Sequence, residues 1–566
     1  MTLTSDRPWL ASYADGVPAV IEVPDEPLTA GLSRTVERHP DRVALVFEGR
    51  TTTYRELARE IERAAGALHG LGVRAGDRVA IALPNCHTHV VAFWAILRLG
   101  AVVVEHNPTY AAAELEHQLA DSGAVVAICW EPTAARVVEV QARTAVRTVL
   151  AVDLTRDLPA IKRFALSLPV AKARTLRSEL RGDPGPTALD WRRVVARATP
   201  LPPNHPQAVA DDIALIQYTG GTTGTPKGAV VTHRSLVANV LQSNAWAQLR
   251  DGEETTFGAL PFFHAFGLTL CLLYAAHMGA TLIAFGKFDP EAILKAQRRR
   301  PATFMPGVAP MFDRLARLAE ERHADLSSIR IAFAGAMPIS KEAADRWERL
   351  TGGLLIEGYG MTETSPIALG NPCSADRRPG SLGLPWPSTD IRIVDQDDPS
   401  KDAPVGERGE LLIRGPQVFQ GYWNRPEDTA DQLLPGGWLR TGDVVTMDDS
   451  GFVTLVDRIK EMIVTGGYKV YPSQVEDQLR AMPGVADVAV VGVPHGDMGE
   501  TVVAAVVLDE GSAGLDLAAV RAWCESRVAR YALPRQLVIV PDLPRSQIGK
   551  VMRRVVREQV LTSSAV

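Results

Sequence analysis

A short run of glycine and threonine residues with one lysine has the composition of a phosphate-binding loop. It spans residues 218–228 and reads YTGGTTGTPKG. Its backbone N–H groups and hydroxyls could surround a polyphosphate, and it follows residues 213–217, which read as a buried strand leading to a sheet edge where phosphates are commonly held. It is not a Walker A loop, because Lys227 stands between Pro226 and Gly228 and no Gly-Lys-Ser/Thr is present. The run predicts a site for the phosphates of ATP.

Length and composition limit what surrounds this loop. A chain of 566 residues is too long for one hydrophobic core, so three or more structural units are expected. A net charge of −6 and a pI near 6.1 argue against nucleic acid as a partner, since such domains usually carry a basic excess. The five cysteines are scattered, without a CxxC pair, which predicts a reducing cytoplasm and neither a zinc site nor a disulfide framework. They are Cys86, Cys129, Cys271, Cys373 and Cys524.

Two segments bear on targeting and membrane insertion. Residues 1–30 carry five acids and no apolar run, so they are not expected to be a secretory signal. Residues 268–285 are apolar and approach the ~20 residues that a membrane span needs, but His277 and Gly279 interrupt them. We interpret this stretch as a buried helix, a turn at Gly279 and a strand over 280–285.

The rest of the pattern predicts an α/β fold. Helical spacing over 54–71 and 89–99 alternates with apolar runs over 78–83 and 101–105, which is the rhythm of a parallel sheet covered by helices. The rhythm returns between 280 and 356, with strands expected near Thr303, over 329–334 and over 354–356. Residues 389–413 change to short, turn-rich strands, and therefore predict a small β-rich subdomain.

The last hundred residues are predicted to form a small α+β domain. The expected elements are helices over 472–481 and 515–531 and strands over 485–493, 501–508 and 536–540. The predicted organisation is a large N-terminal domain over 1–457, a hinge at 458–460 and a C-terminal domain over 461–566.

Residues 158–181 stand apart because six lysines and arginines face one acid, Glu179, and alternate with apolar residues. Such a basic amphipathic stretch fits contact with an anionic membrane surface, and it equally fits a solvated helical face.

The phosphate-loop residues and five further motifs, in this order, resemble the adenylate-forming superfamily of acyl-CoA synthetases, luciferases and peptide-synthetase adenylation domains. The further motifs are GAMP at 335–338, EGYGMTETSP at 357–366, TGD at 441–443, DRIKEMIVTGGYKV at 457–470 and LPRSQIGKV at 543–551. The resemblance covers nearly the whole chain and implies a mobile C-terminal lid.

The resemblance also implies roles for individual residues. Tyr359 would lie against adenine, Thr362 would bind the α-phosphate, and Glu363 would hold Mg²⁺, which typically takes one or two carboxylates beside phosphate and water. Asp443 would accept hydrogen bonds from the ribose hydroxyls, because each carboxylate oxygen has acceptor capacity. The complete implied cofactor-binding set is Thr219, Gly220, Gly221, Thr222, Thr223, Gly224, Lys227, Gly335, Ala336, Tyr359, Gly360, Asp443, Arg458, Gly466, Gly467 and Tyr468.

Three more residues are implied to act in catalysis or motion. Lys550 matches the lysine used for adenylation, His264 stands where the superfamily places a side chain near the substrate carboxylate, and Lys460 matches the hinge. After the acyl-adenylate forms, rotation of the C-terminal domain would withdraw Lys550 and bring the loop at 466–468 to the pantetheine channel, where glycine permits close approach.

Softer matches at the N-terminus, residues 9–18 and 107–119, resemble bacterial long-chain fatty-acyl-CoA ligases. They imply a fatty acid of medium to long chain as substrate, while the superfamily motifs imply ATP, Mg²⁺ and coenzyme A as cofactor and co-substrates. An aryl or other carboxylic acid:CoA ligase, a fatty-acyl-AMP ligase and a non-catalytic lipid-binding or import-coupling protein stay as alternatives. So do a homodimer and a peripheral position on the inner face of the membrane.

Overall fold

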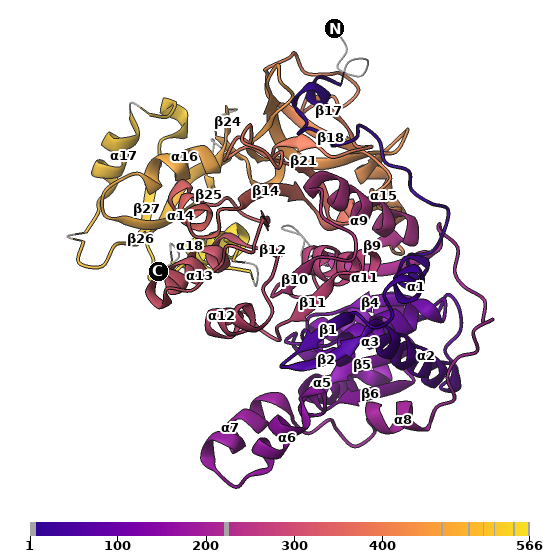
Figure 1. Cartoon of the computed structure of the whole chain (residues 1–566). Coiled ribbons are helices and arrows are strands. Elements are labelled where there is room, and N and C mark those ends of the chain that lie inside the picture. Colours follow the sequence, from indigo (N-terminus) through magenta and orange to yellow (C-terminus); the bar gives the residue numbers. More distant parts are fainter. Residues whose placement is uncertain are drawn as a thin grey trace.

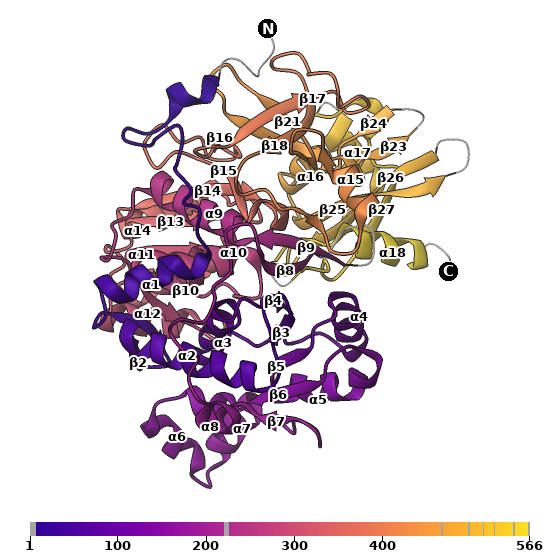
Figure 2. The same cartoon turned by 90° about the vertical axis from the view of Figure 1, so that its right-hand side faces the viewer.

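The computed structural model describes residues 7–219, 226–465, 468–495, 499–512, 514–525, 527–546 and 549–563. Four sheets organise the chain, and helices cover them (Figures 1 and 2). Two of the sheets are large and mainly parallel, one is smaller and antiparallel, and one lies in the C-terminal region. This confirms the predicted α/β class with a β-rich part and a small α+β C-terminal part.

The first large sheet is parallel from β14 to β1 and antiparallel at both ends. In spatial order its strands are β16 (Leu384–Pro385), β15 (Ile367–Gly370), β14 (Leu354–Gly360), β13 (Ile331–Ala334), β12 (Phe304–Gly307), β10 (Thr255–Gly258), β11 (Thr281–Ala284), β1 (Val43–Phe47) and β2 (Arg50–Thr53). Three crossover helices join its parallel strands: α12 (Pro290–Arg299), α13 (Ala309–Arg322) and α14 (Lys341–Thr351).

The second large sheet is parallel from β8 to β7 and ends in an antiparallel hairpin. Its spatial order is β19 (Gly421–Tyr422), β9 (Lys227–Thr232), β8 (Ile213–Thr219), β4 (Val102–Glu105), β3 (Arg78–Ala82), β5 (Val126–Trp130), β6 (Thr148–Val152) and β7 (Leu189–Asp190). In sequence, helix α2 (Tyr54–Gly70) precedes the first of these strands, and α3 (His87–Arg98), α4 (Ala112–Ser122) and α5 (Glu131–Val140) alternate with the strands that follow.

The N-terminal region contains several shorter elements as well. They are η1 (Pro8–Ser12), α1 (Leu28–Arg38), η2 (Gln141–Arg143), η3 (Leu154–Asp157), α6 (Ala160–Ser167), α7 (Ala171–Leu180), α8 (Trp191–Arg197), α9 (His233–Ala247), α10 (Ala265–Gly267), η4 (Leu268–Leu273), α11 (Tyr274–Met278), η5 (Thr362–Thr364) and α15 (Pro426–Gln432). Gly279 ends α11 with φ of 68°, as the turn prediction requires, and β11 follows. Among the described residues, no helix is both long and apolar enough to cross a membrane.

The antiparallel sheet is built from β17 (Asp390–Val394), β18 (Gly409–Arg414), β21 (Trp438–Met447), β20 (Leu433–Leu434) and β22 (Val453–Arg458). It agrees with the β-rich subdomain predicted from residues 389–413. One continuous buried core joins it to the two large sheets, since residues such as Ile391, Phe257 and Val103 belong to the same cluster.

The C-terminal sheet has apolar side chains on both faces. Val488 and Val490 of β25 (Val485–His495) pack into one core, whereas Ala489 and Val491 pack into another, as the period of two in a strand requires. The remaining elements are η6 (Ile459–Glu461), β23 (Ile463–Thr465), β24 (Tyr468–Val470), α16 (Pro472–Arg480), β26 (Gly499–Leu508), α17 (Leu517–Glu525), η8 (Arg530–Ala532), β27 (Gln536–Ile539) and α18 (Arg553–Ser563). Helices α16 and α17 cover the first face, and α18 covers the second.

The single helix predicted over 515–531 is wrong. Helix α17 ends at Glu525, and Arg530–Ala532 form a separate 3₁₀ turn that begins after Ala529 in extended backbone, with ψ of 147°. An extended residue cannot continue a helix. The turn stacks Tyr531 on Tyr468, with ring centroids 4.7 Å apart, and this tertiary contact has no local sequence signal.

Gly360 at the end of β14 provides a test of backbone crowding. A Cβ at this position would lie 1.8 Å from the Pro366 carbonyl oxygen, whereas one on Gly70 of α2 would meet nothing within 4 Å. We expect Gly360→Ala to destabilise the fold by about 1–3 kcal/mol, because the backbone must shift. Gly70→Ala serves as the control and should leave the unfolding temperature unchanged or raised. Equal unfolding temperatures for the two variants, measured by calorimetry, would contradict the predicted crowding.

Candidate functional site

Three of the predicted site residues form a hydrogen-bonded cluster where β14 meets β21 and β22. Tyr359 Oη donates to Asp443 Oδ2 at 2.5 Å, and Arg458 Nε lies 3.1 Å from Asp443 Oδ1. Asp443 and Arg458 are cross-strand partners in the register of β21 and β22. Asp443 is 3% exposed. The burial of Tyr359, together with the negative charge of Asp443, holds the pKa of Tyr359 well above the usual range. We call these three residues the Asp443 cluster.

Lys550 comes to the Asp443 cluster from the opposite end of the sequence. Burial is the main cause that lowers its pKa to about 8, and the positive charge of Arg458 lowers it further, while Glu461 and Asp443 act in the other direction. The neighbouring Gly549, with φ of 80°, packs so closely on the GAMP run that a Cβ would lie 3.2 Å from Met337 Cε. The structure therefore presents Lys550 to the same site as Arg458 and Asp443.

Glu363 and Lys227 meet through an aromatic residue, Tyr422. Tyr422 Oη donates to Glu363 Oε1 at 2.6 Å, and the Lys227 ammonium lies 5.2 Å from the centroid of the Tyr422 ring. Lys227 is also ion-paired with Asp428 of α15. Burial raises the pKa of Glu363, opposed by the Tyr422 hydrogen bond and by Lys227. A cation near these groups would restore the charged carboxylate.

The donor set around Glu363 fits Mg²⁺ better than a soft metal. It offers a single carboxylate, and Mg²⁺ commonly takes one or two together with water and phosphate oxygens. No group of three or more His, Cys, Asp or Glu side chains suited to a metal occurs among the described residues. Glu363 would hold the ion next to the phosphate loop, because Lys227 belongs to that loop and is the first residue of β9.

The phosphate loop itself is only partly described. Thr219 and Lys227 are cross-strand partners in the β8–β9 hairpin. The remaining predicted loop ligands, Gly220, Gly221, Thr222, Thr223 and Gly224, lie outside the described residues. A strand rather than a helix follows this loop, which agrees with the absence of a Walker A pattern.

His264 and Gly335 of the GAMP run, which the resemblance implies to form a wall of the adenine pocket, both lie close to Phe266. The backbone N–H of Phe266 donates to His264 Nδ1 at 3.3 Å, and a Cβ on Gly335 would lie 3.0 Å from the Phe266 ring. Burial lowers the pKa of His264 to about 4, so this imidazole is neutral at pH 7. His264 can therefore hydrogen-bond a substrate but supplies no positive charge.

Two further predicted site residues lie in short irregular segments. Ala336 has φ of 68°, and Thr362 is the first residue of the short η5 segment.

The residues predicted to act in the domain rotation and in thioester formation lie outside the Asp443 cluster. Lys460 is exposed within η6, and the Tyr468 ring is 58% exposed and stacked on Tyr531. Within the described ranges, no hydrogen bond or ion pair joins either residue to the Asp443 cluster. Gly466 and Gly467 lie outside the described residues.

Comparison with known proteins agrees with this geometry. Residues 32–423 match the AMP-binding enzyme family, and residues 474–550 match the AMP-binding enzyme C-terminal domain. The chain belongs to the AMP-binding enzyme family. A long-chain-fatty-acid–CoA ligase of Bacillus subtilis is 36% identical over 98% of this chain and 99% of its own. One from Salmonella typhimurium is 39% identical over 97% and 98%.

A solved structure resembles this AMP-binding enzyme along almost its whole length. The crystal structure of ATP-bound MatB from Rhodopseudomonas palustris is 30% identical, covers 95% of this chain and 99% of its own, and has a TM-score of 0.81. The likeness therefore extends over the described N-terminal and C-terminal sheets alike.

The sequence pattern missed several side chains that complete the site of this AMP-binding enzyme. Tyr422 and Asp428 bind Glu363 and Lys227, although neither lies in a predicted motif. Only their position on β19 and α15, which the fold brings beside β9, reveals them. A local signal could not have found them, because Lys227 and Asp428 are 201 positions apart.

Asp443 provides a test of the predicted nucleotide contact. Asp443→Asn keeps the side-chain shape but removes the charge, and hydrogen bonds to charged groups contribute about 1.5–3 kcal/mol each. We expect AMP to bind at least about tenfold more weakly, as measured by calorimetry. Asp390→Asn is the control, because Asp390 lies in β17 of the antiparallel sheet and is also ion-paired to arginines, Arg7 and Arg414. Unchanged AMP affinity in Asp443→Asn would remove the ribose assignment.

Proposed function

We propose that this AMP-binding enzyme is an ATP- and Mg²⁺-dependent ligase that joins a medium- to long-chain fatty acid to coenzyme A. In the first step the fatty carboxylate attacks the α-phosphate of ATP, forming acyl-AMP and releasing pyrophosphate. In the second step the thiolate of coenzyme A attacks the acyl carbonyl, forming the thioester and releasing AMP. The full-length similarity to long-chain-fatty-acid–CoA ligases carries this proposal.

The charges in the site suit the first step. A fatty carboxylate is already ionised at neutral pH, so it needs no general base, but it must approach a triphosphate of the same sign. Lys550 and Lys227 can offset that repulsion and stabilise the charge that develops on the α-phosphate and the departing pyrophosphate. Mg²⁺ held at Glu363 supplies further positive charge when bound. Lys227 would exchange Asp428 for phosphate oxygens.

The side chains near His264 suit an alkyl chain. The family resemblance implies an acyl tunnel lined by residues around 264–268, 306–309 and 334–335. Phe266, Leu268 and Val308 of these segments are buried, and each buried CH₂ of the substrate would contribute about 0.8 kcal/mol. An aryl acid would also fit an apolar tunnel. Pyrophosphate release over C2 to C18 and aryl acids, measured with and without coenzyme A, separates the fatty acid ligase from an aryl ligase, an acyl-AMP ligase and a non-catalytic lipid-binding protein.

The second step requires a change in the C-terminal region. We propose that it turns about Lys460 once acyl-AMP has formed, so that Lys550 leaves the Asp443 cluster and the loop at 466–468 approaches the thiol. The separate cores of the C-terminal sheet support its movement as a body. In this proposal, the position of Lys550 beside Arg458 and Asp443 corresponds to the adenylate-forming orientation.

Lys550 tests the division into two steps. Lys550→Ala should lower acyl-AMP formation by about 10²-fold or more, because one charge that stabilises the transition state is removed. Thioester formation from supplied acyl-AMP should stay within about twofold. The exposed Lys401→Ala is the control and should change neither step. Pyrophosphate release and thioester formation are measured separately, and equal loss in both would contradict two orientations.

We also propose that the α6–α7 hairpin contacts an anionic membrane surface from the cytoplasmic side. Both views show the hairpin projecting from the bottom of the molecule (Figures 1 and 2). Ile161 is 84% and Phe164 is 70% exposed, whereas the apolar side of α6 that carries Leu166 is buried. The hairpin and the residue that follows it also carry six basic residues: Lys162, Arg163, Lys172, Arg174, Arg177 and Arg181. Exposed apolar and basic side chains together favour the interface of an anionic membrane.

Vesicle binding tests this contact. Each basic residue near an anionic surface contributes about 1 kcal/mol, so replacing four of them should weaken binding at least about tenfold. The variant carries Lys162, Arg163, Lys172 and Arg174 changed to Gln. The control changes four exposed cations elsewhere to Gln, namely Arg250, Arg317, Lys341 and Lys401. Sedimentation with phosphatidylglycerol vesicles at two salt concentrations should separate the variants, and equal binding by both would remove the proposal.

A further inference from the structure

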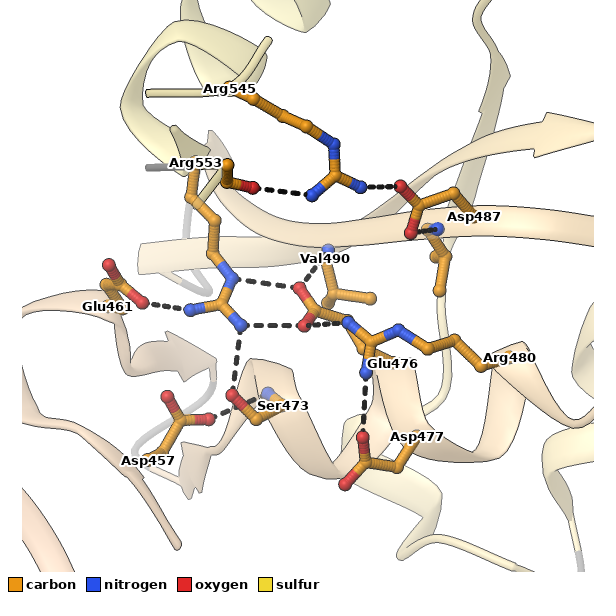
Figure 3. A network of polar contacts seen from close by, with 12 residues as sticks. Asp457, Glu461, Ser473, Glu476, Asp477, Arg480, Asp487, Val490, Arg545 and Arg553 are labelled. Carbon is orange, nitrogen blue, oxygen red and sulfur yellow. Dashed lines mark hydrogen bonds and ion pairs between the residues drawn. The ribbon is translucent and has the colours of Figure 1, made fainter. Parts of the chain in front are cut away.

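Arg553 lies at the centre of a network of charged side chains close to the predicted hinge. It is the first residue of α18, three positions after Lys550. Its Nε lies 2.8 Å from Glu476 Oε1 and its Nη2 lies 2.6 Å from Glu476 Oε2, so the guanidinium holds the carboxylate with two bonds (Figure 3). Nη1 is paired with Glu461. Arg553 therefore connects α18 to α16 and to η6.

Glu476 gives this network a rigid anchor. Its side chain is 3% exposed, and Oε1 also accepts from the backbone N–H of Val490 at 2.8 Å. A buried carboxylate with this many donors has little freedom to move. Arg480 approaches the same carboxylate at 3.2 Å from the more exposed side. The two arginines share one partner, but only Arg553 continues toward Lys550.

The network reaches both sides of the predicted hinge. Glu461 directly follows Lys460. Arg553 Nη2 also donates to Ser473 Oγ at 2.9 Å, and the backbone N–H of Ser473 donates to Asp457 Oδ2 at 2.7 Å. Asp457 is the last residue before the predicted hinge, and its carboxylate accepts this hydrogen bond from the N-terminal end of α16. Through Ser473, Arg553 is thus linked to a hydrogen bond that joins the two sides of the hinge.

A second arginine holds the other side of the Lys550 segment. Arg545 is paired with Asp487 of β25, and its Nη1 donates to the Gly549 carbonyl at 2.7 Å. Ser546 and Lys550 also exchange hydrogen bonds, at 2.8 Å and 3.2 Å. The segment that carries Lys550 is consequently held to the C-terminal sheet on one side and to the hinge by Arg553 on the other.

We propose that Arg553 is a positioning residue for Lys550: by binding Glu461 and Glu476 together, it makes the Lys550 segment turn with the hinge as one body. The inference rests on the proposed two-step function. Without Arg553, α18 would keep its apolar contacts through Val556 and Val560, but its first turn would lose its link to η6. Lys550 would then be displaced from the α-phosphate even in the adenylate-forming orientation. Misplacement by about 1 Å can cost about 10²-fold in rate.

Arg553→Gln tests the positioning role against Arg480→Gln, which also removes a cationic partner of Glu476. Arg553→Gln should lower acyl-AMP formation at least about tenfold and leave thioester formation from supplied acyl-AMP within about twofold. Arg480→Gln should change neither step by more than about twofold. Arg553→Lys keeps one charge without the planar fork and should recover only part of the loss.

The pH profile supplies a readout that a purely structural role would not move. The charged groups that act on Lys550 are Arg458, Arg553, Glu461 and Asp443. Lys550 is charged below its pKa of about 8, so acyl-AMP formation, as kcat/KM for ATP, should fall as the pH rises through that value. Arg553→Gln removes a like charge and should move this fall to higher pH. Glu461→Gln removes an opposite charge and should move it to lower pH.

The outcomes separate this proposal from the function on which it rests. If the unaltered enzyme releases no pyrophosphate with any acid, the proposed function fails. If it is active and Arg553→Gln slows both steps equally, or neither, the positioning role is overturned. The same holds if Arg480→Gln causes an equal loss. Should Arg553→Gln not fold, as judged by calorimetry, Glu461→Gln removes only one of the Arg553 contacts, and a pH profile that does not move would reject the proposal.

Discussion

The buried carboxylate of Asp443 is the interaction on which the arrangement of the site depends. A buried charge is costly unless it is paired and hydrogen-bonded, and Asp443 obtains its partners from two different sheets. Tyr359 comes from the end of β14 in the first large sheet, and Arg458 comes from β22 beside it in the antiparallel sheet. The requirement to satisfy one carboxylate therefore ties the junction of these sheets to the geometry of the proposed nucleotide site.

A second constraint is the concentration of positive charge that the proposed first step needs. Lys550 and Arg458 lie near one another, and this repulsion contributes to the lowered pKa of Lys550. The enzyme offsets it with Asp443 and Glu461, and Lys227 has Asp428 as a partner. Each cation is accompanied by an acid that a phosphate oxygen could replace. Positive charge can thus be held in place before the nucleotide arrives, at a modest energetic cost.

The C-terminal region combines its own stability with attachment at few points. Its sheet is covered on both faces, so the strand β25 is apolar at nearly every position rather than at alternate ones. Lys469 pairs with Asp397, and Gln396 approaches Tyr471 at 3.3 Å, so polar contacts join this region to the antiparallel sheet. Polar contacts of this kind can be exchanged with water more readily than a shared apolar core. This difference is what a turning lid requires.

The local features of this protein follow from its amino-acid sequence. The helix over 54–71 was predicted from the helical spacing of its apolar residues, and α2 follows it closely, opened by a capping box between Thr53 and Glu56. The order of motifs predicted the family, and four residues named from those motifs, Tyr359, Asp443, Arg458 and Lys550, lie together in the structure. The tertiary structure alone decided the helix break before Tyr531, the placement of Tyr422 and Asp428 beside Lys227, and the link from Arg553 to Glu461. The two partners are 59 positions apart in the Tyr422–Glu363 contact, 201 in the Lys227–Asp428 contact and 92 in the Arg553–Glu461 contact. Periodicity and propensity describe neighbours along the chain, whereas such partners meet only after the sheets have packed.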